Sequence, residues 1–360
     1  MSVINKNRLN KLRVVMERMG MDAVFIVSKE NRRYFSGFTG TSGTLIITQN
    51  EELLLTDFRY VEQAKAEAPE FEVIQHTGLL QEAVGEKLES LHAKKVGMED
   101  SLTVGFLREV KNKSSAAYHS VENEMNEIRK IKDENEIEKI KKGIELCDLA
   151  FEHILSFIKP GLTEKEIGLE LEYIMKKNGA EGIKANHVIA SGERSALPHG
   201  AATNRVVNTG EFVKMDIGAV VDGYFSDFTR TVVIGEPTEK QLEIYHIVRT
   251  AQEEALRFIG PGKVCSEVDE VARSIIREAG YGENFGHSLG HALGLHIHEK
   301  PVMRSTDQSI LEPGMVITVE PGIYLPGWGG VRIEDLVIIR EDRYENATKA
   351  TKELLVIDPS

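Results

Sequence analysis

The carboxyl-terminal part of the chain repeats itself at an offset of about 100 residues, and this duplication constrains the fold more than any other feature. A helical stretch ends in FIKPG at residues 157–161, and a second ends in FIGPG at residues 258–262. Each is followed by a predicted capped helix that stops near a glycine, the first beginning at Thr163 and the second at Ser266. Corresponding features follow one another in the same order in both stretches, and the number of residues between them changes only slowly. This predicts two duplicated units that pack face to face.

Each unit offers two acidic residues. A turn glycine leads into a strand that ends in an acid, and the return strand carries a second acid. The four acids are Asp216, Asp227, Glu320 and Glu334. Facing units bring their carboxylates together, and carboxylates in one buried site cannot all stay ionised without cations. The repeat therefore predicts a site for divalent ions, and four acids can hold two of them.

The stretch DIGAVVDGYFSDFTRT, residues 216–231, predicts a β-hairpin in the first unit. Asp222-Gly223 between apolar runs is typical of a type I′ turn. Because side chains alternate along a strand, Asp216 and Asp227 share one face, roughly 7–8 Å apart at the backbone. Two readings remain open for this pair taken alone: a surface acid beside a turn acid, or a cation held between two buried acids.

Four histidines lie in the stretch GHSLGHALGLHIHE, residues 286–299, at positions His287, His291, His296 and His298. A lone histidine among apolar residues is more often structural, but four within twelve residues favour a functional site. His287 and His291 do not form the zinc-protease signature, because no Glu follows the first of them and the glycines disfavour a regular helix. Oxygen-rich ligands with one or two imidazoles suit a hard divalent ion such as Mn²⁺.

The first third of the chain predicts a small α/β domain that extends to about Val121. Helical spacing alternates there with short β-rich runs. Helices are predicted at residues 5–19, 60–67 and 80–92, and strands at 22–28, 43–49, 52–58, 71–76 and 94–100. A charged linker is expected next, leading into a long helix whose start resembles a capping box formed by Asp133 and Glu136.

The chain has 360 residues, a length typical of two domains, and its apolar content is sufficient for a hydrophobic core in each. Lys and Arg total 44 against 57 Asp and Glu, and no basic tract stands out, which disfavours nucleic acid and anionic membranes as partners. No apolar run approaches the ~20 residues needed to span a bilayer. Cys147 and Cys265 lie in helical patterns and the amino terminus lacks a signal-peptide core, so we expect a cytoplasmic location.

Five segments together resemble the pita-bread metallopeptidases, in particular the proline-selective branch with Xaa-Pro dipeptidases (prolidases) and aminopeptidase P. They are ALPHG (196–200), MDIGAVVDGYFSDFTRT (215–231), HSLGHALGLHIHE (287–299), VEPGIY (319–324) and GVRIEDLV (330–337). The resemblance covers essentially the whole chain. It implies an α/β (α+β) fold, with a creatinase-type domain at residues 1–125 and a pita-bread catalytic domain with an internal pseudo-two-fold repeat at residues 126–360.

The resemblance implies a site for two divalent metal ions. The family's five ligands fall on Asp216, Asp227, His291, Glu320 and Glu334. Asp227 and Glu334 would bridge both ions, Asp216 would bind one, and His291 with Glu320 would complete the other. Mn²⁺ is the expected ion, with Co²⁺ or Zn²⁺ as alternatives.

The resemblance also implies roles around the substrate. A hydroxide between the two ions would attack the scissile carbonyl, and Glu320 would shuttle protons. His199, His287 and His298 would line the substrate site and help to stabilise the tetrahedral intermediate, while Arg332 would lie beside the substrate. For each histidine, simple packing remains the alternative.

The implied activity is metal-dependent hydrolysis of Xaa-Pro bonds in dipeptides or short peptides. Many prolidases carry an arginine directly after a His-Glu-x-Pro motif, whereas this chain has Val302 there and Arg304 two residues further on. Release of the first residue from longer Xaa-Pro peptides, the aminopeptidase P activity, is therefore the alternative.

More distant classes fit the sequence less well. Methionine aminopeptidases normally lack the amino-terminal domain and the sequence segments that surround His298 and Arg332 in this chain. Creatinase needs no metal and does not keep the five ligands, and a non-enzymatic binding protein on this fold would be expected to have lost ligands. Relatives form dimers, so we expect a homodimer in which the amino-terminal domain caps the site and joins subunits.

Overall fold

The computed structural model describes residues 3–184 and 187–359, and it falls into two compact units. The first unit extends to Arg129 and the second begins at Lys130. Both combine helices with β-sheets, so the predicted mixed α/β class is confirmed.

A six-stranded mixed sheet organises the first unit. Its order is β4-β3-β2-β1-β5-β6; β2 pairs antiparallel with β1 and β3, and the other pairs are parallel. The strands are β1 (Ala23–Ile26), β2 (Thr44–Thr48), β3 (Glu52–Thr56), β4 (Glu72–Gln75), β5 (Lys95–Met98) and β6 (Ala117–Ser120). The strands predicted from the first third of the sequence are all present, and β6 was not predicted.

The helices of the first unit are α1 (Val3–Met19), α2 (Lys29–Ser36), α3 (Val61–Glu67), α4 (Leu80–Ser90), α5 (Val104–Lys113) and α6 (Glu122–Lys130). The predictions of α1, α3 and α4 are confirmed, whereas α2 and α5 were not predicted. The predicted charged linker is wrong, because its sequence folds as α6. Met125 and Ile128 lie one turn apart on a buried face of α6, and acidic residues occupy its first turn, so a charged stretch forms an amphipathic helix.

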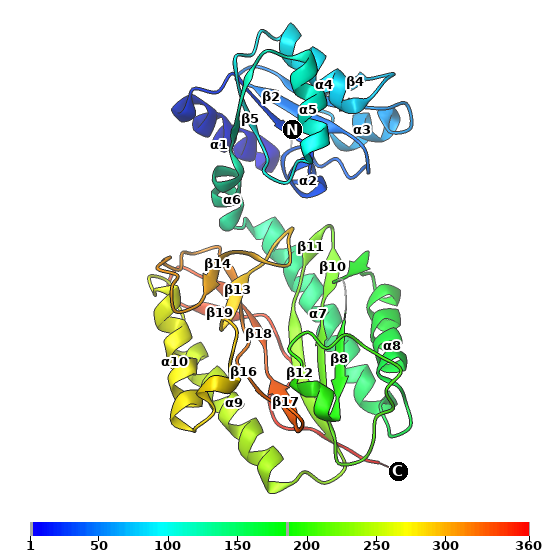
Figure 1. The fold of residues 1–360 in the computed structure, drawn as a ribbon, viewed down its shortest axis with the longest axis vertical. Helices are drawn as coiled ribbons and strands as arrows, with labels where there is room; N and C mark the ends of the chain where they lie inside the picture. Colours follow the sequence, from blue (N-terminus) through cyan, green and yellow to red (C-terminus); the bar gives the residue numbers. More distant parts are fainter. Residues whose placement is uncertain (1–2, 185–186, 360) are drawn as a thin grey trace. The chain divides into compact units, whose positions relative to one another are not determined.

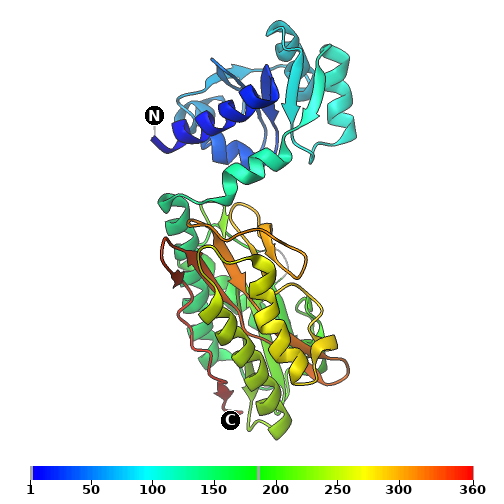
Figure 2. The same ribbon diagram turned by 90° about the vertical axis from the view of Figure 1, so that its left-hand side faces the viewer.

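The second unit is built on two pairs of helices. They are α7 (Glu134–Phe157) with α8 (Glu164–Lys177), and α9 (Glu239–Phe258) with α10 (Cys265–Glu278). Figure 1 shows α7 and α8 beside one set of strands and α9 and α10 beside the other. Figure 2 shows α9 and α10, coloured yellow-green to yellow, running side by side. No helix in the described part of the chain is long and apolar enough to cross a bilayer.

Two sheets form the interior of the second unit. One has the order β20-β12-β9-β8 and the other β14-β13-β15-β18-β19. Their strands are β8 (Val188–Ser191), β9 (Phe212–Ile217), β12 (Phe228–Ile234), β13 (Gly290–Ala292), β14 (Glu299–Met303), β15 (Val316–Val319), β18 (Asp335–Ile339), β19 (Tyr344–Asn346) and β20 (Val356–Ile357). Short strands complete the unit: β7 (Gly182–Ile183), β10 (Ala219–Val221), β11 (Tyr224–Phe225), β16 (Gly322–Leu325) and β17 (Gly329–Arg332).

The same order of elements occurs twice in the second unit, as the repeat predicts. Helix pair α7–α8 precedes the antiparallel pair β9–β12, and helix pair α9–α10 precedes the antiparallel pair β15–β18. An antiparallel bridge between Thr229 and Glu334 joins the two repeats, and the Glu334 N–H donates to the Thr229 carbonyl at 3.1 Å. The repeats therefore meet at the strand positions that carry the acids.

One helix start, that of α10, differs between the repeats. Asp133 and Thr163 cap α7 and α8 with the reciprocal hydrogen bonds of a capping box. The predicted cap at Ser266 is wrong: α10 begins one residue earlier, and its cap position has no side-chain hydrogen bond. Instead, the carbonyls of Ser309 and Asp307 accept the first N–H groups of α10, so loop backbone takes the place of a side-chain cap.

The predicted hairpin of residues 216–231 is confirmed. Asp222 and Gly223 have φ of 47° and 77°, as a type I′ turn requires, and the flanking residues pair directly. Further along, Asp216 pairs with Thr229, the register that places the two aspartates on one face.

Candidate active site

The first pair of acids sits at an interruption of this hairpin. Asp216 lies in β9 and Asp227 directly precedes β12, and both are buried. Gly218 lies between them across the strands, where an added Cβ would be 2.4 Å from the Ser226 carbonyl oxygen. Only glycine fits there, so the backbones come close while the two carboxylates turn into the same space.

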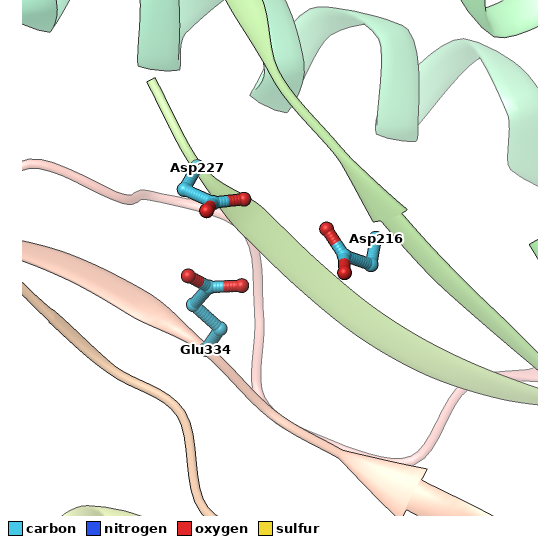
Figure 3. Close-up of side chains that lie close together, drawn as sticks. All are labelled: Asp216, Asp227 and Glu334. Atoms are coloured by element: carbon cyan, nitrogen blue, oxygen red, sulfur yellow. The ribbon is translucent and has the colours of Figure 1, made fainter. Parts of the chain in front are cut away.

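The second repeat supplies its acids at equivalent places. Glu320 directly follows β15, and Glu334 directly precedes β18. Carboxylate oxygens of Asp216, Asp227 and Glu334 lie within 4.8 Å of one another, and Figure 3 shows the three side chains converging from strands of both repeats. Thr229 donates to Glu334 Oε2 at 2.6 Å and fixes its orientation.

His291 and Glu320 form the other side of the cluster. The His291 Nε2 atom is 3.3 Å from Glu320 Oε1 and 3.8 Å from Asp227 Oδ2. Nδ1 of the same ring donates to the Ala292 carbonyl at 3.1 Å, so Nε2 is the nitrogen that faces the acids. Asp227 thus belongs both to the group of three carboxylates and to the group around His291.

The electrostatics of the cluster call for a cation. Burial raises the pKa of Glu334 well above its usual range, and the charges of Asp227 and Glu320 raise it further. Among the described residues nothing donates to Glu334 Oε1, although this atom is buried. An orphaned carboxylate oxygen in a ring of oxygen donors and one imidazole fits a hard divalent ion.

Lys184 enters this cluster and was not among the predicted site residues. Its Nζ contacts Asp216 Oδ1 and lies 2.5 Å from Asp227 Oδ1. The β7–β10 pairing brings the lysine there, and its N–H donates to the Gly218 carbonyl at 2.8 Å. No spacing rule signals this contact, because it joins a short irregular segment to a hairpin more than thirty residues away.

Arg332 is held by hydrogen bonds on all sides. Its Nε donates to Thr229 Oγ1 at 3.1 Å, its Nη1 to the Pro198 carbonyl at 3.1 Å and to the Tyr324 hydroxyl at 3.0 Å, and its Nη2 to Asp216. The guanidinium is buried and lines the same cavity as the acids. The arginine therefore ties the second repeat to an acid of the first.

The structure brings the three other predicted histidines to the cavity as well, so His199, His287 and His298 all line it. His287 Nδ1 donates to the Ser288 carbonyl at 2.8 Å, so its Nε2 accepts from the Tyr324 hydroxyl at 2.8 Å. The His298 ring lies edge-on to His291, with centroids 4.4 Å apart.

The cavity has a volume of about 790 Å³, which is typical of a small-molecule site. Val188, Phe225, Ile297 and Val302 give apolar surface to a wall that also carries histidines and carboxylates. All its lining residues belong to the second unit. The cavity is therefore large enough for a short peptide beside the carboxylate cluster.

Comparisons with known proteins identify the family. The model of metallopeptidase family M24 matches residues 138–341, and the model of the creatinase/prolidase amino-terminal domain matches residues 8–131. The chain belongs to metallopeptidase family M24. As a member of M24 it is a peptidase that depends on divalent metal ions, and the buried carboxylate cluster lies within the matched residues.

Relatives of this M24 peptidase match it over nearly the whole length. An Xaa-Pro dipeptidase of Pyrococcus furiosus is 40% identical, over 97% of this chain and 100% of the relative. The structure of an Xaa-Pro dipeptidase from Bacillus anthracis has a TM-score of 0.95 at 43% identity, covering 98% and 99% of the two chains. The structure of an X-Pro aminopeptidase from Thermotoga maritima has a TM-score of 0.89 at 41% identity, covering 95% and 100%. The two-domain, pita-bread architecture predicted from the sequence is thus confirmed.

Two further residues of the M24 site were missed by the sequence analysis. Tyr324 bridges His287 and Arg332 through its hydroxyl. Lys214 is fully buried; its Nζ donates to the carbonyls of Ser195 and Leu197 and lies 4.8 Å from the centre of the Tyr324 ring. Tyr324 is the last residue of the VEPGIY segment, so its place beside Glu320 could have suggested a role in the site. Nothing in the sequence around Lys214 indicates such a role.

Proposed function

We propose that this M24 peptidase hydrolyses Xaa-Pro bonds in dipeptides and short peptides with the help of two divalent metal ions. The observation that carries the proposal is the convergence of acids from both repeats with His199, His298 and Arg332 in one cavity. Relatives named Xaa-Pro dipeptidases, 40% and 43% identical to this chain, support the substrate class.

The residues proposed to hold the ions are Asp216, Asp227, His291, Glu320 and Glu334. Asp227 and Glu334 are the proposed bridging ligands, and the place of Asp227 in both groups of donors supports this role. When bound, the ions would activate a water molecule and polarise the scissile carbonyl. Carboxylate-rich sites favour Mn²⁺ on hardness, with Co²⁺ or Zn²⁺ as the alternatives.

Glu320 is the proposed proton carrier. Burial alone would raise the pKa of Glu320, but the hydrogen bond and charge of His291, with the charge of Arg332, lower it below its usual range. The carboxylate is therefore ionised and can accept a proton from the attacking water. It would then give that proton to the proline nitrogen as the peptide bond breaks.

The proline preference follows from the chemistry of the bond. An Xaa-Pro bond has no N–H to donate, and the ring needs an apolar surface. His199, His298 and Arg332 can surround the imino nitrogen with donors, and Ile297 and Val302 offer apolar contact for the ring. His287 would orient Arg332 through Tyr324.

The test is a substrate panel with purified protein and Mn²⁺: Ala-Pro, Ala-Pro-Ala, Ala-Ala and Met-Ala-Ser. Cleavage of the two proline peptides alone is the expected result. Equal cleavage of Ala-Pro and Ala-Ala would contradict the proline preference, and cleavage of Met-Ala-Ser alone would point to a methionine aminopeptidase.

Aminopeptidase P activity is the second candidate. Val302 lies in the cavity wall where many prolidases would have an arginine to meet the carboxylate of a dipeptide, and one similar structure is of an X-Pro aminopeptidase. The ratio of kcat/KM for Ala-Pro-Ala and Ala-Pro decides between the two. A higher value for the tripeptide would favour the aminopeptidase.

We also infer a homodimer and a cytoplasmic location. The free, buried thiols of Cys147 and Cys265 support a reducing compartment. Sedimentation at micromolar concentration should show a dimer, and a monomer would contradict this inference.

A further inference from the structure

The described residues that line the cavity include one lysine and one arginine, Lys184 and Arg332. Arg332 is committed to fixed partners, since its three nitrogens donate to Thr229, the Pro198 carbonyl, the Tyr324 hydroxyl and Asp216. A guanidinium held in this way can act on groups that reach it where it stands, but it is poorly placed to turn toward an anion elsewhere in the cavity.

Lys184 differs from Arg332 in the hydrogen-bond partners of its side chain, which are all carboxylates. Its Nζ meets the carboxylates of Asp216 and Asp227, which are proposed metal ligands. Its stem lies against Gly218, where an added Cβ would be 3.0 Å from Lys184 Cδ. The stem thus lies against the cavity wall, and the ammonium stands at the end of a long side chain with several rotatable bonds.

Divalent ions and the Lys184 ammonium compete for the same two carboxylates. When the acids hold divalent ions, Coulomb repulsion drives the ammonium away from them. The side chain of Lys184 is only 12% exposed where it meets the acids, and its stem beside Gly218 keeps the displaced ammonium near the cavity wall. A charge with so little access to water is costly unless an anion pairs with it.

The protein offers no spare carboxylate for this purpose among the described lining residues. The three acids of the wall, Asp216, Asp227 and Glu320, are all proposed metal ligands. The other polar groups of the wall are chiefly histidines, and Val302 is apolar. A carboxylate of the substrate can then serve as the partner of Lys184.

We propose that Lys184 is a specificity-determining residue that binds a carboxylate of the peptide substrate. The inference rests on the proposed function and narrows it to anionic peptides. Two carboxylates qualify: the terminal carboxylate of a dipeptide, and an acidic side chain on the residue before proline. The first would let Lys184 take over the task that an arginine in place of Val302 has in many prolidases.

The experiment uses the Mn²⁺-loaded full chain and two matched pairs of substrates. Ala-Pro against Ala-Pro-amide tests the terminal carboxylate, and Glu-Pro-amide against Gln-Pro-amide tests the side chain. Lys184→Met keeps much of the stem and removes the charge, Lys184→Arg keeps the charge, and Lys300→Met is the control at an exposed lysine outside the lining.

In one of the two pairs, Lys184→Met should raise KM for the substrate with the free carboxylate about tenfold or more and leave KM for its amide counterpart nearly unchanged. This is the size of one hydrogen bond between charged groups. Lys184→Arg should restore most of the preference, and Lys300→Met should behave as wild type. The pair that responds identifies which carboxylate is bound.

An unchanged ratio within both pairs would overturn the proposal, whatever the absolute rates. Calorimetric titration with Mn²⁺ gives an independent readout: tighter Mn²⁺ binding by Lys184→Met without a change in either ratio would leave the lysine only a competitor of the metal and would also overturn it. Failure of the wild-type protein to cleave any Xaa-Pro peptide would instead contradict the proposed function. If Lys184→Met does not fold, Lys184→Gln carries the same comparison.

Discussion

Arg332 and Asp216 form a buried ion pair that joins the second repeat of the catalytic unit to the first. The arginine is the last residue of β17 in one repeat, and the aspartate lies in β9 of the other. Hydrogen bonds to Tyr324 and Thr229 hold the guanidinium in place. Because Asp216 is a proposed metal ligand, this pair links the metal side of the cavity to the side proposed to hold proline.

Arg332→Ala should lower kcat/KM on Ala-Pro by about 10²-fold or more, the size typical of losing one donor to the transition state. Metal content should stay the same, because the arginine is not a ligand. His298→Ala should have an effect of similar size. Steady-state kinetics with metal analysis on the same samples checks both variants, and loss of metal together with activity would assign Arg332 to the metal site instead.

Asp227→Asn should remove both divalent ions, since the residue is the proposed bridge between them. Wild-type protein should hold about two ions per chain, the number that a four-acid site supports. Elemental analysis after dialysis measures the ratio, and Asp222→Asn in the hairpin turn is the control for a charge lost outside the cluster. One ion in the wild type, or two in Asp227→Asn, would contradict the dinuclear site.

Lys214→Met should lower kcat/KM by about tenfold or more because the loop that carries His199 loses two hydrogen bonds. A double-mutant cycle with His199→Ala distinguishes positioning from general destabilisation. If Lys214 acts through His199, the double variant should be no worse than His199→Ala alone. Additive losses would show that the lysine does not act through this histidine.

Acid should weaken folding through His187. Burial, aided by the charge of Lys184, lowers the pKa of His187 from 6.5 to about 4, and among the described residues neither ring nitrogen has a hydrogen-bond partner. The unfolded chain therefore binds the proton more tightly. This contribution to the free energy of unfolding is present above pH 6.5 and falls by roughly 1.4 kcal/mol per pH unit as the pH drops toward 4.

Denaturant unfolding of metal-free protein at pH 7 and pH 5 tests this dependence. His187→Leu should lose less stability between the two pH values than the wild type does, by about 2 kcal/mol. A chelator keeps metal release out of the comparison. Equal losses in the two proteins would mean that His187 is not the group that titrates.

Local chemistry made much of the fold predictable. Asp222-Gly223 specifies a turn by its backbone preferences, and the turn sets the register that brings Asp216 opposite Thr229. The capping boxes of α7 and α8 are likewise local, since partner residues lie three apart. The assignment of the five metal ligands, by contrast, stays a prediction that the variants above can test.

The unpredicted parts depend on contacts between distant residues. The first N–H groups of α10 find carbonyls in a loop some forty residues later, so no cap is needed at Ser266. Lys184 reaches the acids only because β7 pairs with β10, and Lys214 is tolerated in the interior only because carbonyls of another loop accept its hydrogen bonds. Hydrophobic periodicity and residue type do not predict contacts of this kind between distant residues.

The bridge between Thr229 and Glu334 has a consequence for how the duplicated halves can change over evolutionary time. Neither half contains all of the clustered carboxylates, and a shift of either backbone by one residue would pull a carboxylate out of the cluster. A single half would have to pair with a second copy to gather these carboxylates. Substitutions can accumulate elsewhere in either half, but the backbone positions at which the two halves meet can change only together.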